Sequence, residues 1–213
     1  MSGLAAPVCT YIGDTVDTGN GTTYTFTNHA IGTAAPDRLV VVVAHVSEVT
    51  GGAGIGSPTI GGSAATIAVE SDESSGPTSS AIFYLLVPSG TTATIEFTTA
   101  DASTHGSVSV YTITGWDSVT PIATGHDEKT STTAASAALS TNIGDIVIAG
   151  TAAYSNSPTT TWTGGVTEND DSAFGGEAGT YSSAHGTATA ATTTPVATPS
   201  TAAARSFVAA AWR

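Results

Sequence analysis

Short runs of β-branched and aromatic residues recur along the whole chain, and each run ends near glycine, proline, asparagine or aspartate. No segment keeps apolar residues at the roughly 3.6-residue spacing of an amphipathic helix over several turns. The longest apolar run, "LVVVVAHV" at 39–46, suits a buried strand and falls short of the roughly 20 residues that a membrane-spanning helix needs. This pattern predicts an all-β fold.

Turn signals divide these runs at short intervals. Turns are expected at 19–21, 61–62, 88–90 and 142–145, since glycine tolerates positive φ and Asn, Asp and Pro favour tight turns. Many short strands at this spacing, about 12 here, are typical of an antiparallel β-sandwich or jelly roll. The expected strands are 22–27, 38–47, 66–71, 81–87, 93–98, 106–114, 122–126, 136–140, 145–152, 160–167, 181–188 and 205–212.

Part of the sequence repeats its own arrangement. "DRLVVVVAHVS" at 37–47 parallels "GDIVIAGTAAYS" at 144–155, and a Gly-Gly hairpin follows each stretch. We therefore expect one β-sandwich domain over residues 21–213, with pseudo-repeated halves at about 21–125 and 126–213. Convergence of two stretches on common hairpin chemistry is the alternative explanation.

The N-terminal residues 1–20 are expected to form either a separate segment or the first edge strand. They lack the basic stretch and the long apolar stretch of a secretory signal, so no export signal is expected. A single cysteine, Cys9, excludes an internal disulfide and a cysteine-based zinc site.

The charge balance narrows the classes of partner. The chain has 4 Lys and Arg against 17 Asp and Glu, a formal net charge of −13. Such a surface repels phosphate backbones and anionic lipid, because binding to either depends mainly on Lys and Arg. Nucleic-acid binding and membrane insertion are therefore not expected.

No catalytic constellation stands out in the sequence. Nucleophilic catalysis needs Ser or Cys beside His and a carboxylate, and no G-x-S-x-G turn is present. His45 lies within an apolar run and is expected to be a packed or hydrogen-bonded ring. We expect a non-enzymatic protein with no cofactor.

Three acidic stretches are candidate metal sites. In a strand His126 and Glu128 would share a face, which could begin a metal site, although a solvated turn is the simpler interpretation. Residues 70–73 and 168–171 each follow a Gly-Gly hairpin and do not match the spacing of a calcium-binding loop. They are expected to be acidic loop tips, with a weak calcium site as the alternative.

Sugar binding would require an exposed aromatic residue beside polar groups. The candidates for such ligand contacts or exposed-loop contacts are the aromatic residues Trp162 and Tyr154, next to Asn169, Asp170 or Asp171. The loops 49–55, 70–79 and 168–179, rich in Gly, Ser and acidic residues, are the expected exposed tips.

A series of short motifs resembles a family of structural proteins encoded by tailed bacteriophages and prophages, whose domains are β-sandwiches. The motifs are "DRLVVVV", "TIGGSAAT", "PSGTTATI" and "ITGWDSVTP", at 37–43, 59–66, 88–95 and 113–121. In the second half "GDIVIAG", "TWTGGVTEND" and "SFVAAAW" continue the series in the same order. The motifs consist of turns and buried strands, so the resemblance supplies no catalytic residues.

The resemblance implies a non-enzymatic structural protein of a bacteriophage particle, displayed on the virion surface as a head decoration or head-fibre subunit. Its partners would be other virion proteins, such as major capsid or tail proteins, and copies of itself, with a trimer favoured. A tail-associated receptor-binding or adhesin module that recognises host surface glycan is the alternative. The threonine-rich composition and scarcity of Lys and Arg suit an exposed particle surface, since few trypsin sites are present.

Overall fold

The computed structural model describes residues 6–48, 54–72, 77–130, 134–155, 159–175 and 179–213. No helix in these ranges is long and apolar enough to cross a membrane. The strands of the first half are β1 (Val8–Asp17), β2 (Gly21–Ala30), β3 (Leu39–Glu48), β4 (Gly56–Ile60), β5 (Ser63–Ala64), β6 (Thr66–Asp72), β7 (Thr78–Leu86) and β8 (Thr92–Thr114). The strands of the second half are β9 (Ala123–Lys129), β10 (Ala135–Ser136), β11 (Leu139–Ser140), β12 (Ile146–Tyr154), β13 (Thr160–Thr163), β14 (Thr167–Ala173), β15 (Thr180–Thr187), β16 (Thr192–Thr193), β17 (Val196–Pro199) and β18 (Ala204–Trp212). The predicted all-β antiparallel fold is confirmed.

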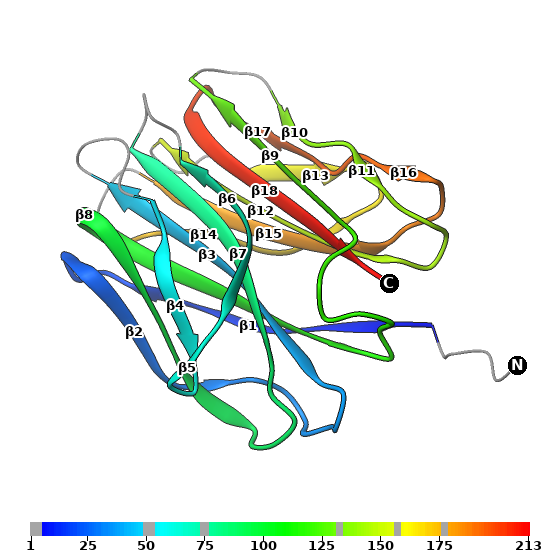
Figure 1. Cartoon of the computed structure of the whole chain (residues 1–213). Coiled ribbons are helices and arrows are strands. Elements are labelled where there is room, and N and C mark those ends of the chain that lie inside the picture. The colour runs from blue at the N-terminus through cyan, green and yellow to red at the C-terminus, as the bar shows by residue number, and fades with distance from the viewer. Residues whose placement is uncertain (1–5, 49–53, 73–76, 131–133, 156–158, 176–178) are drawn as a thin grey trace, which may run out of the picture.

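Strands β1 to β8 form a first sandwich, in which the long strand β8 belongs to two layers (Figure 1). Its C-terminal part joins the large layer β1-β8-β3-β7-β6, and its N-terminal part joins the small layer β2-β8-β4-β5. Alternate residues of β3, such as Val40 and Val42, pack in the core between these layers with Phe83 and Phe97. The reason is the two-residue period of a strand, which directs every second side chain to the same face.

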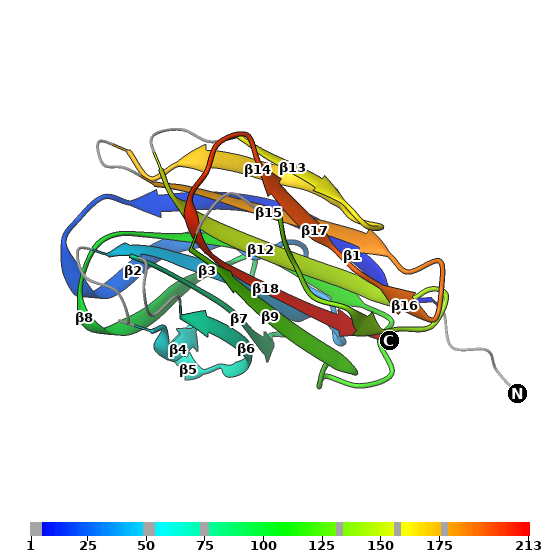
Figure 2. The ribbon, with the colours of Figure 1, turned by 90° about the horizontal axis from the view of Figure 1, so that it is seen from above.

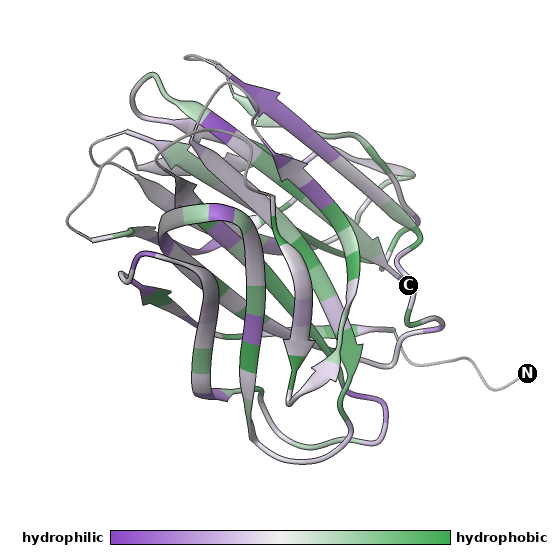
Figure 3. Cartoon of the chain, turned by 60° about the vertical axis from the view of Figure 1, so that its left-hand side comes forward, coloured by the Kyte–Doolittle hydropathy of each residue, from purple (hydrophilic) through white to green (hydrophobic). Residues whose placement is uncertain are grey.

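Strands β9 to β18 form a second sandwich. Its large layer has the order β14-β15-β12-β18-β9, and the small sheets β10-β17-β13 and β11-β16 cover that layer. Val147 and Ala149 of β12 pack in its core with Trp162 and Phe207. Figure 3 shows polar and apolar residues alternating along the strands, as packing on one face of each strand requires.

The two large layers repeat each other strand for strand. The order β1-β8-β3-β7-β6 corresponds to β9-β18-β12-β15-β14, and the bulges of the last strands coincide as well. The register shifts between Ile67 and Val69 in β6, and between Glu168 and Asp170 in β14. Val69 and Asp170 therefore occupy equivalent positions, and the expected pseudo-repeat is present in the fold.

The large layers of the two sandwiches pack face to face, with β3 against β12 and β7 against β18. Figure 2 shows β13 and β17 on one side of this stack and β4 and β5 on the other. Tyr84 meets Trp212 edge-on, with the ring centroids 5.9 Å apart. The apolar part of this interface comprises Leu39, Val41, Val43, Val69, Ile82, Tyr84, Tyr111, Ile113, Ile146, Ile148, Val208, Ala210 and Trp212.

Several expectations about the strands and loops were wrong. The strand predicted at 160–167 is divided between β13 and β14, which belong to different sheets. The described residues form strands β1 to β18, more than the predicted number, because short pairings such as β11 with β16 carry weak sequence signals. The strands predicted at 93–98 and 106–114 are one strand, β8. Much of the predicted exposed loops 70–79 and 168–179 belongs to β6, β7 and β14, whereas 49–53, 73–76 and 176–178 lie outside the described residues.

Candidate functional site

Trp162 is buried, 9% exposed, which overturns the prediction of an exposed aromatic platform. Its ring packs on Phe207 with centroids 6.0 Å apart, and its Nε1 donates a hydrogen bond to Ser182 Oγ (2.7 Å). Strand alternation places this side chain between the layers of the second sandwich, so the ring acts as a core residue.

Asp170 is buried as well, which overturns its predicted exposure. Its Oδ2 accepts a hydrogen bond from Ser109 Oγ of the first sandwich, while its Oδ1 accepts from the backbone N (2.5 Å) and the Oγ of Ser183. Burial raises the pKa of Asp170 to about 6, although the hydrogen bonds from Ser109 and Ser183 lower it. A carboxyl group thus joins the sandwiches where the equivalent Val69 makes apolar contacts.

Asn169 extends this polar contact along the interface. Tyr111 OH donates to Asn169 Oδ1 (3.2 Å) and lies 2.5 Å from Ser183 Oγ. His185 Nδ1 is 2.7 Å from the same Asn169 oxygen, and burial lowers the pKa of His185. A neutral imidazole with its proton on Nδ1 fits this contact.

A second carboxylate crosses the interface in the opposite direction. Asp14 of β1 accepts hydrogen bonds from Tyr11 OH (3.0 Å) and from Tyr181 OH of β15 (2.8 Å). Burial and the nearby carboxylates raise the pKa of both tyrosines, so both phenols remain donors at neutral pH. Asp14 and Asp170 therefore give the interface a polar side next to its apolar side.

His45 belongs to the same interface. Its Nδ1 is 2.8 Å from Ser80 Oγ, which is in turn 2.7 Å from Ser206 Oγ of the second sandwich. Complete burial lowers the pKa of His45 to about 3, so the ring is neutral. Its Nε2 has no hydrogen-bond partner in the part of the chain that the structure describes.

An open groove of about 510 Å³ brings two predicted residues together between β13 and β14. Its walls include Trp162, Glu168 and Asp171, with several threonines. Burial raises the pKa of Asp171, although the hydrogen bond from Thr160 N (2.8 Å) lowers it. The pKa of Glu168 is also raised, mainly by burial and to a lesser extent by the charge of Asp171. Two interacting carboxyl groups therefore lie at the rim of this groove.

The remaining candidates lie apart from these groups. Tyr154 is 43% exposed at the end of β12. In the "HDE" stretch Asp127 is bound to Lys129 Nζ (2.7 Å) and to Ser136 N (3.0 Å), while His126 and Glu128 are exposed. Within the described ranges, no three His, Cys, Asp or Glu side chains are grouped so as to hold a metal ion.

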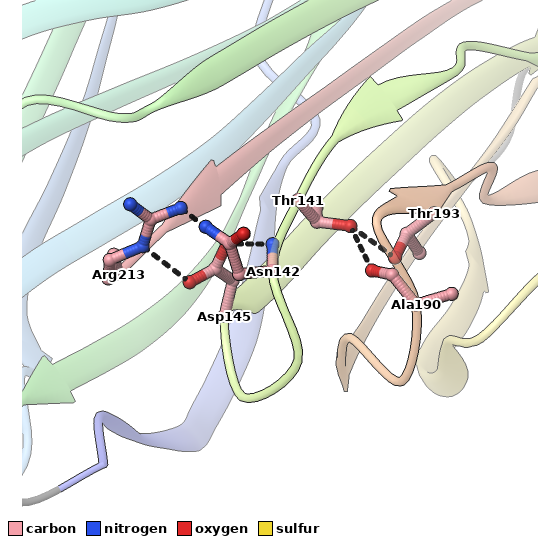
Figure 4. Close-up of polar contacts among 6 residues, drawn as sticks. All are labelled: Thr141, Asn142, Asp145, Ala190, Thr193 and Arg213. Carbon is pink, nitrogen blue, oxygen red and sulfur yellow. Dashed lines mark hydrogen bonds and ion pairs between the residues drawn. The ribbon is translucent and has the colours of Figure 1, made fainter.

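Figure 4 shows a further buried carboxylate, Asp145, at the opposite end of β12. It accepts a hydrogen bond from Asn142 N (2.5 Å) and pairs with Arg213 Nε (3.1 Å). The Thr141 hydroxyl bonds nearby to the carbonyl of Ala190 (2.9 Å). These contacts close the turn before β12 and leave Asp145 only 2% exposed.

The sequence interpretation missed the interface carboxylate Asp14 and the hydroxyl groups that form the polar contacts between the sandwiches, which belong to Ser109, Tyr111, Tyr181 and Ser183. A signal is present in retrospect. "SVSVY" at 107–111 and "YSSAH" at 181–185 place hydroxyl residues within strands that are otherwise apolar. Such an alternation marks a face that is both buried and polar, because buried hydroxyls need partners. Chemically, the arrangement links two sandwiches through hydrogen bonds.

Comparison with known proteins adds distant structural likenesses. No protein-family model and no curated protein matches the sequence. A structure described as "Crystal structure of Cucumber Necrosis Virus" is 10% identical over 95% of this chain and 85% of that chain, with a TM-score of 0.26. A structure of infectious bursal disease virus, Gx strain, is 11% identical over 97% of this chain, with a TM-score of 0.27. The chain spans 40% of the length of that second protein.

Proposed function

We propose that this chain is a non-enzymatic structural protein of a bacteriophage particle, displayed on the virion surface as a head decoration or head-fibre subunit. One observation carries the proposal. The buried Asp170 and the exposed Asp14 accept hydrogen bonds that join the two sandwiches, and the buried His45 is linked across the interface through Ser80 and Ser206. The sequence motifs that resemble phage structural proteins also lie in strands and turns, as expected for a role in architecture.

The end of the stack that carries the chain termini suits contact with other proteins. Val8, Ile122 and Ile143 are exposed apolar residues near the chain termini, where Ile143 and Arg213 line a common groove with Pro7. Exposed apolar residues of this kind mark contact surfaces. We propose that this end contacts other virion proteins and that the chain acts as a symmetric homo-oligomer, with a trimer favoured, and without a cofactor.

Burial of two of the four basic residues suits a protein exposed outside a particle. Arg38 and Arg205 are each 1% exposed, so trypsin cannot reach either residue in the folded chain. The net charge of −13 disfavours attachment to packaged DNA.

Immunogold electron microscopy of intact particles, with antibody raised against the purified chain, tests the proposal. Label over the whole capsid is expected for a decoration or head-fibre subunit. Label confined to the tail tip would favour the alternative function, and particles without label would reject a virion-surface role.

The alternative is a tail-associated receptor-binding or adhesin module for host glycan. The groove between β13 and β14 favours this candidate, because Glu168, Asp171 and several threonines line it together with Trp162. Titration with host polysaccharide should then change the tryptophan fluorescence, and Asp171→Asn should weaken the response. An unchanged spectrum at saturating polysaccharide would exclude this groove as a glycan site.

A further inference from the structure

Strands β1 and β2 follow each other directly, yet they do not pair. Each pairs with β8, and the two diverge from their connecting turn (Figure 1). Between them lies a groove of about 620 Å³, lined by residues 12–18 of one strand and 25–30 of the other. Ile12 and Phe26 provide apolar wall, and threonines, Asp14 and Asp17 provide polar wall.

The second sandwich shows the same edge in a closed form. Gly13 pairs with Val110 and Gly125 pairs with Ala209, and these two positions correspond in the repeated layers. A Cβ added to Gly125 would lie 2.7 Å from Ala137 Cβ, so the chain packs tightly there. A Cβ added to Gly13 would meet no described atom within 4 Å. The open edge is therefore specific to the first sandwich.

Backbone irregularities on both walls open the groove. The register of β1 shifts between Tyr11 and Gly13, and that of β2 shifts between Phe26 and His29. Asn28, within the second shift, has φ 54°, a left-handed conformation that is uncommon for a residue other than glycine. Bulges bend the strand that carries them, so β1 and β2 separate instead of meeting.

The walls offer an extended chain both hydrogen bonds and charge. Within the described ranges, residues 12–17 pair only with β8, so the other edge of β1 presents unpaired backbone N–H and C=O groups. Asp14 and Asp17 line the groove without any Lys or Arg. The Asp17 Oδ1 atom accepts a hydrogen bond from Gly19 N (2.8 Å), which leaves its other oxygen for a ligand.

A second copy of this chain does not supply the complementary charge. Its four basic residues are Arg38, Lys129, Arg205 and Arg213. Arg38 and Arg205 are buried, Lys129 pairs with Asp127, and Arg213 pairs with Asp145. The basic segment must therefore belong to a different protein.

We propose that the groove between β1 and β2 binds an extended segment of another protein that carries Lys or Arg. The segment adds to the free edge of β1, and its basic side chains reach Asp17. Main-chain hydrogen bonds then provide affinity, and the Asp17 carboxylate and the apolar wall provide selectivity. This inference goes beyond the proposed function and does not depend on the location of the protein in a particle.

The test uses the full chain and a library of random nine-residue peptides. Binders should be enriched in Lys and Arg and depleted in Pro, which lacks the N–H that a paired strand donates. Hydrogen exchange of the complex should protect amides at 12–17. Asp17→Asn should weaken the enriched peptides at least fivefold, whereas the matched variant Glu128→Gln, on the equivalent edge strand β9, should leave affinity unchanged.

Thermal unfolding establishes that both variants are folded before affinity is compared. The proposal fails if no peptide is enriched, if the enriched peptides show no basic bias, or if they bind wild type and Asp17→Asn equally. Protection of amides elsewhere, without protection of 12–17, would also overturn it. None of these outcomes depends on the result of immunogold labelling, so the two proposals fail independently.

Discussion

Gly150 of β12 lies directly against Val43 of β3, and no room for a Cβ exists between them. A Cβ at this position would overlap Val43 Cγ1 and come within 2.8 Å of His45 Cε1. The contact brings the two sandwiches together near the middle of their large layers, where β3 packs on β12. The backbone φ of Gly150 is not in the left-handed region, so its conformation does not require glycine. Glycine is required there because the two sandwiches approach too closely for a Cβ atom.

Gly150→Ala should therefore destabilise the protein by about 1–3 kcal/mol, the usual effect of overpacking a close-packed interior. Urea unfolding measures the loss. Gly21→Ala serves as the control, because a Cβ there would lie 3.6 Å from the nearest described atom. Equal effects of the two substitutions would show that packing between the sandwiches does not limit residue 150.

Asp170 should make the protein less stable as the pH rises. Its folded pKa of about 6 lies above the unaltered value of 3.8, so the folded state binds the proton more tightly. Stability is then lost between about pH 4 and 6, by roughly 3 kcal/mol in total. Asp170→Asn should remove this decline in unfolding free energies measured at pH 4.5 and 7.5. Asp171→Asn, with its side chain outside the interface, should retain most of it.

His45 should make the protein less stable as the pH falls. Its folded pKa of about 3 lies below the unaltered value of 6.5, so below pH 6.5 the unfolded state takes up a proton that the folded state does not. Each unit of pH below 6.5 should cost about 1.4 kcal/mol. His45→Phe should flatten the unfolding free energy between pH 6.5 and 4.5. The exposed His126→Gln should not, and a matching change in both variants would contradict the assignment.

Arg38 should not tolerate lysine. Its guanidinium donates to the carbonyls of Gly32 (2.8 Å), Val87 (2.8 Å) and Ser89 (2.7 Å) through three different nitrogens. An ammonium group cannot reproduce this planar set of donors. Arg38→Lys should destabilise the protein by about 2 kcal/mol, since buried carbonyls lose their donors. Thermal unfolding tests this expectation, and a melting temperature equal to wild type would refute it.

The fold was largely predictable because strand signals are local. The strand predicted at 38–47 is β3, Leu39–Glu48, and the strand predicted at 145–152 lies within β12, Ile146–Tyr154. Both are runs of apolar residues bounded by turn signals, which identify buried strands without knowledge of their neighbours. The candidate site was less predictable, because Trp162 and Asp170 were expected at the surface and both are buried.

The sequence by itself determined the all-β class, the hairpin at Gly61 and Gly62 and the repeated arrangement, since each depends on residues close together in the chain. The second Gly-Gly pair, at 164–165, instead connects β13 and β14, which belong to different sheets. Only the tertiary structure decided which faces are buried. Asp170 and its equivalent, Val69, follow the same bulge, yet Asp170 meets Ser109 and Val69 packs in the apolar part of the interface. A carboxyl group can be buried only where another segment brings it donors. Ser109 is 61 residues away in the chain and reaches Asp170 only when the two sandwiches stack.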